Sequence, residues 1–209
     1  MPRRVICISR LVGAGGGEVG QSVAASLGYR LVDEEIVQQA AESSGVSVDE
    51  LADAERRTKV IDSLMRSLAV GGSAGLLTAG TAPIYLPGGT DSKALRALIQ
   101  QSIHETAQRG DVVIVSHAAS YALAGSDDVL RVLVTASPET RTGRTAQEGS
   151  LDSKKAAKAV AESDGQRAAY LRRFYGVDDE LPTHYDLALN SDRLPVALMS
   201  ELIVRAASA

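Results

Sequence analysis

Glycine residues suited to holding a phosphate group lie near the amino end of this sequence. Gly13, Gly15, Gly16 and Gly17 follow a short apolar run at residues 5–8. Glycine allows backbone conformations that other residues resist, and it lets N–H groups come close to a ligand. A helix that begins after such a loop adds unpaired N–H groups and a positive dipole end. This stretch therefore predicts a phosphate-binding loop.

Arginine residues suited to the same task lie in the basic segment 139–175. The segment holds eight lysine or arginine residues against five acidic residues, whereas the whole chain has a net charge of −4. The arginine side chain is planar and permanently charged, and it can donate two parallel hydrogen bonds to phosphate. Phosphoryl transfer requires such positive groups around the migrating charge. Arg167 and Arg173 are the candidates for this role; the alternative is an exposed helix with salt bridges, such as Asp164 with Arg167.

Two motifs overlap in the glycine-rich stretch and predict different ligands. The P-loop pattern G-x-x-x-x-G-K-[ST] fits Gly15, Gly20 and Ser22, but Gln21 stands where lysine belongs. The dinucleotide pattern G-x-G-x-x-G fits Gly15, Gly17 and Gly20, and Asp33 lies near the position of the ribose-binding acid. A dinucleotide site has its first glycine at the strand end, whereas residues 10–14 separate the apolar run from Gly15. The longer loop favours phosphate, and a glycine-rich connection that binds nothing is the remaining alternative.

The secondary structure that must position these residues alternates between strands and helices. Strands are expected at residues 5–8, 29–33, 111–116, 129–135 and 185–190. Helices are expected at residues 19–27, 47–68, 91–109, 152–175 and 194–207, with another that begins at Pro138. This alternation predicts an α/β fold, with a central parallel sheet of about five strands and helices on both faces. Asp33 and His117 would lie at carboxyl ends of strands, where such sheets bind ligands.

The composition argues against several classes of protein. A net charge of −4 disfavours general nucleic-acid binding, which requires a basic surface. We expect neither a membrane span nor a signal peptide, because no apolar stretch is long enough. The single cysteine, Cys7, is expected to be a buried, inert thiol in a cytoplasmic protein. The helices expected at 47–68 and 91–109 could form the face of a homodimer.

The order of these features resembles the cytidylate kinase-like branch of the P-loop nucleoside monophosphate kinases. The segments that carry the resemblance are ISRLVGAGGGEVG, LVDEEIV, VTASPETRTGR, ESDGQRAAYLRRFYG and YDLALNSDRL, which span residue 8 to about residue 194. The resemblance implies a P-loop NTPase-type three-layer sandwich formed by a single domain, residues 1–209. It also implies an acceptor-binding insert at about 47–92 and a lid-like helical segment at about 145–176. Within the insert, residues 69–91 are expected to form a mobile loop that closes over the substrate.

The same resemblance implies ATP-dependent phosphoryl transfer to a nucleoside monophosphate or a similar small acceptor. The phosphates of ATP would be cradled by Gly13, Gly15, Gly16, Gly17, Gly20, Gln21 and Ser22. Ser22 would hold Mg²⁺, and Arg141 and Arg144 would lie on the donor side of the lid. Arg10, Asp33 and His117 would lie near the acceptor. Arg167 and Arg173 would neutralise the transferring phosphoryl group.

Two departures from the family pattern leave other functions open. Gln21 brings no charge, and loss of a positioned cation costs several kcal/mol of transition-state stabilisation; Arg10 is the nearest arginine that could compensate. His117 stands close to where related proteins carry an arginine. The first alternative is a catalytically weak or inactive nucleotide-binding homologue, and a minor alternative is a dinucleotide-binding oxidoreductase. If Gln21 faces phosphate, Gln21→Lys should raise the transfer rate.

Overall fold

The computed structural model of the protein describes residues 3–33, 92–116 and 119–209. Almost all of the expected acceptor-binding insert at about 47–92 lies outside these residues. The expected mobile loop at 69–91 and His117 also lie outside them. The predictions made for these segments therefore stay predictions.

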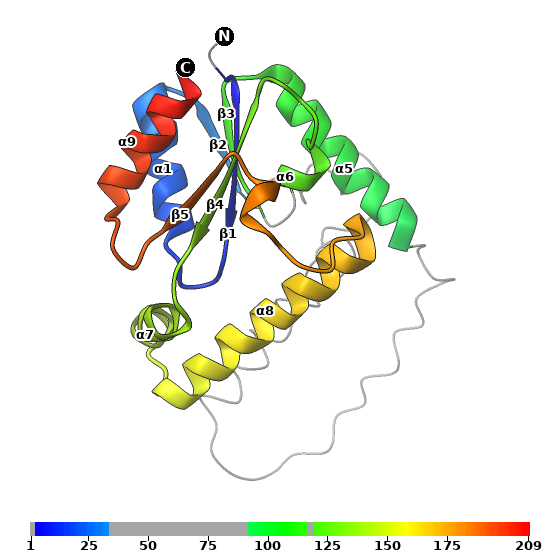
Figure 1. Ribbon diagram of the computed structural model, residues 1–209. Coiled ribbons are helices and arrows are strands. Elements are labelled where there is room, and N and C mark those ends of the chain that lie inside the picture. Colours follow the sequence, from blue (N-terminus) through cyan, green and yellow to red (C-terminus); the bar gives the residue numbers. More distant parts are fainter. Residues whose placement is uncertain (1–2, 34–91, 117–118) are drawn as a thin grey trace, which may run out of the picture.

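Five parallel strands form the centre of the molecule, as the alternating pattern predicts (Figure 1). They are β1 (Val5–Arg10), β2 (Arg30–Val32), β3 (Val112–Val115), β4 (Val129–Thr135) and β5 (Leu187–Asn190). The strand order is β2-β3-β1-β4-β5, with Val5 of β1 in register with Val112 of β3 and Val129 of β4. β1 therefore lies between β3 and β4, whereas the dinucleotide-binding order 3-2-1-4-5-6 places it between strands 2 and 4. This order argues against the oxidoreductase alternative.

Helices cover both faces of the sheet (Figure 1). On one face, α1 (Gly16–Leu27) and α9 (Val196–Ala207) pack around a core that includes Ile6, Ile8, Val23, Met199 and Ile203. On the other face, α5 (Ser92–Arg109) and α6 (Ala119–Ala122) pack around a core that includes Val5, Cys7, Ile103, Ile114 and Leu123. Successive residues of β1 alternate between the two cores, as the pleat of a strand requires. Because both faces are covered, the strands consist of nearly continuous apolar runs.

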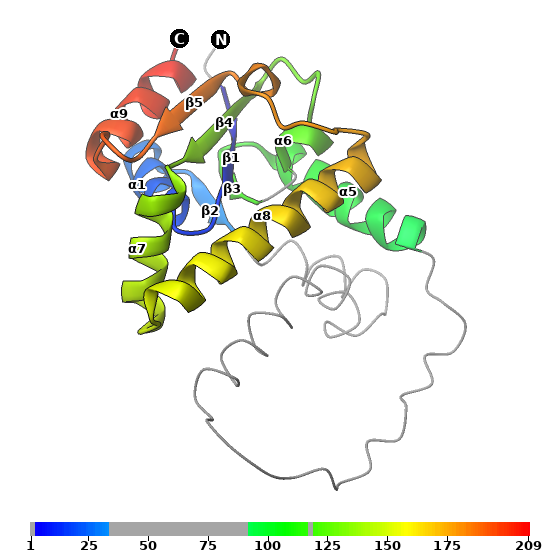
Figure 2. The same ribbon diagram turned by 60° about the horizontal axis from the view of Figure 1, so that its bottom comes forward.

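Two further helices lie across the carboxyl edge of the sheet, where parallel sheets bind ligands (Figure 2). α7 (Pro138–Gly149) begins after the N-cap Ser137, whose side chain accepts a hydrogen bond from the Thr140 N–H at 3.3 Å. α8 (Ser153–Tyr175) begins after the N-cap Asp152 and ends at Gly176, which has a φ of 67°. The helices expected from Pro138 and at 152–175 are therefore present above the glycine-rich loop.

The boundaries on both sides of the loop differ from the sequence expectation, and two short helices were not expected. β1 continues to Arg10, and α1 begins at Gly16 rather than at Val19, so the loop between them is shorter than expected. The short helix α6 was not expected, and a single turn of 3₁₀ helix (Pro182–His184) precedes β5. The early start of α1 changes which glycines belong to the loop.

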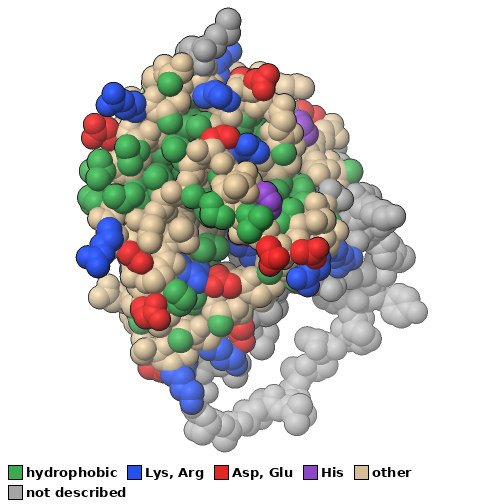
Figure 3. Space-filling model, viewed as in Figure 1, with side chains coloured by type: hydrophobic (Ala, Val, Ile, Leu, Met, Phe, Trp, Pro, Cys, Tyr) green, Lys and Arg blue, Asp and Glu red, His purple; other side chains and the backbone are tan. Residues whose placement is uncertain are grey.

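The face of the molecule seen in Figure 3 carries mixed charges and a small apolar area. Basic and acidic side chains alternate over the face seen in Figure 3, and hydrophobic side chains gather over α9. The exposed Leu198 and Leu202 belong to this helix. In the described part of the chain, no helix is both long enough and apolar enough to cross a bilayer.

Candidate functional site

The loop of residues 11–15, between β1 and α1, has the backbone geometry of an anion-binding turn. Gly13 and Gly15 have φ angles of 73° and 78°, in the left-handed region that glycine adopts without strain. Gly15 is the N-cap of α1 and has no side chain to satisfy the first N–H groups of the helix. Left-handed residues that alternate with right-handed ones turn successive N–H groups toward a common point. The start of α1 therefore carries the partial positive charge of a helix N-terminus, directly after two left-handed glycines.

Residues distant in the sequence hold the carbonyl groups of this loop. The Ser191 hydroxyl donates a hydrogen bond of 2.8 Å to the Ala14 carbonyl oxygen. Arg144 of α7 donates to the Gly13 carbonyl oxygen at 3.3 Å and to the Ser191 hydroxyl at 2.8 Å. The C=O and N–H of a trans peptide point in opposite directions, so the Gly15 N–H points away from Ser191. Ser191 and Arg144 thereby fix the direction of the loop amides.

Three residues that the P-loop pattern assigned to the phosphate site lie further along, inside α1. An added Cβ at Gly20 would lie 2.4 Å from the Val115 side chain, so this glycine permits close packing of α1 on the sheet. Gln21 is exposed on the helix, and the Ser22 carbonyl accepts a hydrogen bond from Ser26. Gly16 and Gly17, rather than Gln21 and Ser22, therefore stand where the loop becomes helix.

Arg10 and Asp33, two of the predicted acceptor-side residues, lie together at the carboxyl edge of the sheet. Nη2 of Arg10 lies 3.3 Å from Oδ2 of Asp33, and both side chains are more than one-third exposed. The Arg10 side chain also runs along Gly16 and Gly17, at the start of α1. Arg10 and Asp33 therefore lie at the same edge of the sheet as the glycine-rich loop.

Arg141 and Arg144, predicted on the donor side, both anchor α7. Arg141 is 2% exposed, and it forms a bidentate ion pair with Asp164 of α8, with Nη1 at 2.8 Å from Oδ1. An added Cβ at Gly13 would lie 2.5 Å from the Arg141 carbonyl oxygen, so α7 packs directly on the loop. Through these contacts, α7 connects the loop to α8.

Arg167 is buried, and its guanidinium group is paired with a carboxylate that the sequence did not indicate. Its Nε donates to Glu180 at 2.7 Å, and its Nη2 donates to the Tyr185 hydroxyl at 3.2 Å. The Tyr185 hydroxyl also donates to Glu180. The salt bridge between Asp164 and Arg167, which was the alternative to a functional role, is absent from the interactions described for these residues; Asp164 pairs with Arg141 instead.

The pKa values of this buried group follow from burial and charge. Burial lowers the pKa of Arg167, but the hydrogen bond and charge of Glu180 raise it by more. Burial raises the pKa of Glu180, and its contacts with Arg167 and Tyr185 lower it by more. Burial is also the main reason why the pKa of Tyr185 is raised. Arg167 and Glu180 are therefore both charged at neutral pH.

Arg173 does not share this environment. It lies six residues after Arg167, which places it about 240° further around the helix. Its side chain is exposed, and its guanidinium carbon lies 5.2 Å from the centroid of the Phe174 ring. The fold therefore separates the two arginines that were expected to act together on the transferring group.

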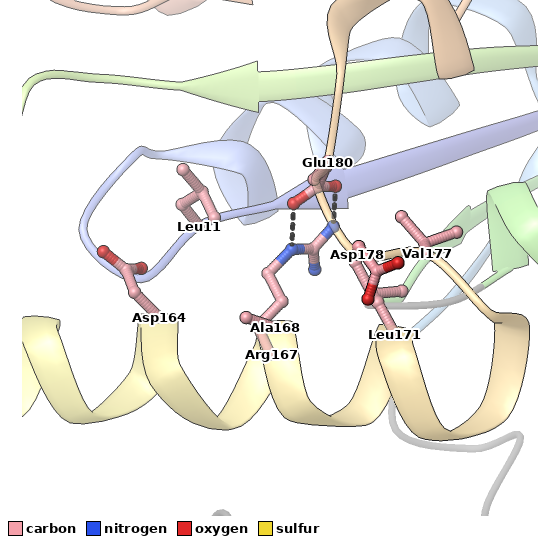
Figure 4. A pocket seen from close by; sticks show the side chains of 8 residues that line it. All are labelled: Leu11, Asp164, Arg167, Ala168, Leu171, Val177, Asp178 and Glu180. Atoms are coloured by element: carbon pink, nitrogen blue, oxygen red, sulfur yellow. Dashed lines mark hydrogen bonds and ion pairs between the residues drawn. The ribbon is translucent and has the colours of Figure 1, made fainter.

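A cavity of about 180 Å³ lies between the loop and α8, next to Arg167 (Figure 4). Its lining residues are Leu11, Asp164, Arg167, Ala168, Leu171, Val177, Asp178 and Glu180. Figure 4 shows that Arg167 and Glu180 face each other from α8 and from the segment that follows it. The cavity thus connects the glycine-rich loop with the buried ion pair.

Sequence reasoning missed the residues that brace the site. Ser191 and Asp192 follow β5 directly, and Asp192 accepts a hydrogen bond of 3.0 Å from the Ser137 N–H at the start of α7. Hydrogen bonds from Thr140 and Ser137 hold the pKa of Asp192 below its usual range. Their position directly after a predicted strand could have marked them, because residues at the carboxyl ends of parallel strands meet at one edge of the sheet.

The described residues do not fit a protein-held Mg²⁺. Ser22, the predicted ligand, lies beyond the first turn of α1, and Gly17 at the loop–helix junction has no hydroxyl group. Within the described ranges, no group of three or more His, Cys, Asp or Glu side chains could hold a metal ion.

A comparison with known protein families shows the family to which this chain belongs. A model described as the cytidylate kinase-like family matches residues 5–193, which include the sheet, the loop, α7 and α8. The chain belongs to the cytidylate kinase-like family. A comparison with curated proteins finds no match.

Solved structures similar to this cytidylate kinase-like protein share its fold at low identity. An uncharacterized protein from Eubacterium ventriosum is 15% identical, with a TM-score of 0.65 over 97% of each chain. A shikimate kinase from Bacteroides thetaiotaomicron is 15% identical, with a TM-score of 0.51 over 97% of each chain. A shikimate kinase from Acinetobacter baumannii, in complex with shikimate, is 11% identical, with a TM-score of 0.50 over 99% of this chain and 92% of that chain. Together with the strand order, these matches show a P-loop kinase-like fold.

Proposed function

We propose that this cytidylate kinase-like protein transfers the terminal phosphoryl group of ATP to a nucleoside monophosphate. The observation that carries the proposal is the loop of residues 11–15, whose carbonyl groups are held by Ser191 and Arg144. The Ala14 N–H already donates to the Leu11 carbonyl oxygen at 3.0 Å. With the Gly13 and Ala14 carbonyls held on one side, the N–H groups of Gly15 and of the start of α1 would be available to an anion on the other. A polyphosphate matches this arrangement of donors.

In the proposed reaction, a phosphate oxygen of the acceptor forms a bond to the γ-phosphorus of ATP. The bond between that phosphorus and the β–γ bridging oxygen breaks, and ADP leaves. The backbone N–H groups of Gly15, Gly16 and Gly17 would stabilise the charge on the β- and γ-phosphates. The lid-like helices α7 and α8 would close the site from above, and Arg167 would approach the transferring group from the cavity beside the loop.

A second function is favoured by two specific observations. The loop–helix junction carries glycine where P-loop kinases carry lysine, and Glu180 already neutralises Arg167. Both features would weaken stabilisation of the transition state. A nucleotide-binding homologue with little or no transfer activity is therefore the alternative.

Two assays separate these functions. Calorimetry with Mg·ATP tests binding, which both functions require. A coupled assay of ADP release with CMP, dCMP, UMP and AMP then tests transfer. Acceptor-dependent ADP release with at least one monophosphate supports the kinase. ATP binding without any acceptor-dependent release supports the alternative, and absence of ATP binding contradicts both.

A further inference from the structure

We infer that Arg10 supplies, from the end of β1, the phosphate-binding cation that P-loop kinases carry at the start of the helix, and that Asp33 positions it. The inference rests on the proposed function. It concerns how this chain replaces the missing lysine. It gives separate roles to Arg10 and Asp33, which were both expected near the acceptor.

The two glycines at the start of α1 leave room for the Arg10 side chain. An added Cβ at Gly16 would lie 2.5 Å from Cβ of Arg10. An added Cβ at Gly17 would lie 2.8 Å from Nη1 of Arg10. Real Cβ atoms essentially never come within 3.0 Å of such neighbours. The Arg10 side chain therefore fills the space next to the first turn of α1 in which side chains from positions 16 and 17 would otherwise begin.

The position of this guanidinium group is unfavourable unless an anion is near. The start of a helix carries a partial positive charge, so a second positive charge beside it is repelled. Asp33 offsets part of this repulsion through an ion pair of 3.3 Å. A bound phosphate would offset the rest, because it would interact with the helix N–H groups and with Arg10 at the same time.

Arg10 also differs from Arg141, Arg144 and Arg167 in its availability. The side chains of Arg141 and Arg167 are 3% and 6% exposed, and each is held by a carboxylate. Arg144 is committed to Gly13 and Ser191. By contrast, the side chain of Arg10 is 36% exposed, and a partly exposed ion pair such as Arg10–Asp33 is weak. Phosphate can therefore recruit Arg10 without breaking a buried ion pair.

The first test measures ATP affinity by calorimetry, so it does not depend on knowing the acceptor. Arg10→Ala should weaken ATP binding about 10- to 100-fold, the range expected for hydrogen bonds to a charged group. Binding of adenosine, which has no phosphate, should be unchanged. Arg205→Ala removes an equal charge from the exposed last turn of α9 and should leave the ATP affinity unchanged.

A rescue experiment then tests the location of the cation. In the Arg10→Ala background, a side chain at position 17 no longer meets Nη1 of Arg10, so Gly17→Lys should recover much of the lost ATP affinity. Gln21→Lys adds the same charge on an exposed part of α1 and should recover none. Rescue by Gln21→Lys and not by Gly17→Lys would contradict the assigned location and favour the original P-loop register.

The role of Asp33 is tested by a double-mutant cycle. Asp33→Asn should weaken ATP binding less than Arg10→Ala does, and it should have no further effect once Arg10 is absent. An equal effect of Asp33→Asn in both backgrounds would show that Asp33 does not act through Arg10. If the wild-type protein binds ATP and Arg10→Ala binds it equally well, the inference is wrong while the proposed function stands. If the wild-type protein does not bind ATP, both are wrong.

Discussion

The hydroxyl group of Ser191 donates a hydrogen bond of 2.8 Å to the carbonyl oxygen of Ala14. The residue that follows β5 thus holds the loop that follows β1. Ser191 is buried and also accepts a hydrogen bond from Arg144 of α7. Three segments far apart in the sequence therefore meet at one hydroxyl group, and the conformation of the glycine-rich loop depends on all three.

Replacement of Ser191 by alanine should loosen this loop. The Ala14 carbonyl would be left buried without its partner, so we expect Ser191→Ala to lower the free energy of unfolding by about 1–3 kcal/mol. ATP affinity should also fall, because the loop amides would lose their fixed direction. Denaturant unfolding and calorimetry measure the two effects. Ser208→Ala is the matched control, since the exposed Ser208 hydroxyl donates only to the Val204 carbonyl of its own helix. Equal losses of stability in both variants would contradict the bracing role.

The contact between α7 and the loop can be tested at Gly13. Gly13 and Gly28 have similar φ angles, 73° and 67°, so alanine at either position costs about 1–2 kcal/mol in backbone strain. Only Gly13 is also crowded, because its Cβ would lie 2.5 Å from the Arg141 carbonyl oxygen, whereas nothing lies within 4 Å at Gly28. Gly13→Ala should therefore destabilise the protein by about 1–3 kcal/mol more than Gly28→Ala, measured by urea unfolding. Equal destabilisation would contradict the close packing of α7.

A role of Arg167 in phosphoryl transfer can be tested separately from the contribution of the Arg167–Glu180 pair to stability. Arg167→Ala would leave Glu180 as a largely buried, unpaired carboxylate and should lower the free energy of unfolding by about 3 kcal/mol. The double variant Arg167→Met with Glu180→Gln removes both charges and should recover most of that stability. If Arg167 acts on the transferring phosphoryl group, the stable double variant should still lack acceptor-dependent ADP release. Normal release by this variant would remove Arg167 from the mechanism.

The pH dependence of stability follows from the carboxylates that are paired in the folded protein. Burial raises the pKa values of Glu180 and Asp186, but their arginine partners lower them by more. Each folded-state pKa thus lies below its ordinary value, 4.5 for Glu180 and 3.8 for Asp186. The unfolded chain therefore takes up protons first, and stability is lost as the pH falls through this range. Urea unfolding as a function of pH should show this loss, with a smaller slope in Asp186→Asn; an unchanged slope would contradict the pairing with Arg131.

The strands of the sheet were predictable because each depends on a short apolar run that can be recognised in the sequence. The strands are short runs of Val, Ile and Leu between turn residues, and burial on both faces requires such runs. The ends of α1 at Gly28 and of α8 at Gly176 were readable for a similar reason, since both glycines adopt left-handed conformations.

The start of the helix that follows the glycine-rich loop was not predictable in the same way. Gly13, Gly15, Gly16, Gly17 and Gly20 are so closely spaced that two motifs fit the same stretch. The choice depends on where α1 begins, and contacts with Arg10 and Val115 constrain the glycines in its first turns. Likewise, Glu180 comes to Arg167 only because the chain turns back after α8, so helix periodicity alone favoured Asp164 as the partner.

The most direct test of the central claim is to follow the backbone amide resonances of the ¹⁵N-labelled protein while ATP is added. We predict that the amides of Gly15, Gly16 and Gly17 shift most with ATP and do not shift with adenosine, because phosphate binds at these N–H groups. Saturation with ATP that leaves these three resonances unmoved while others shift would contradict the account.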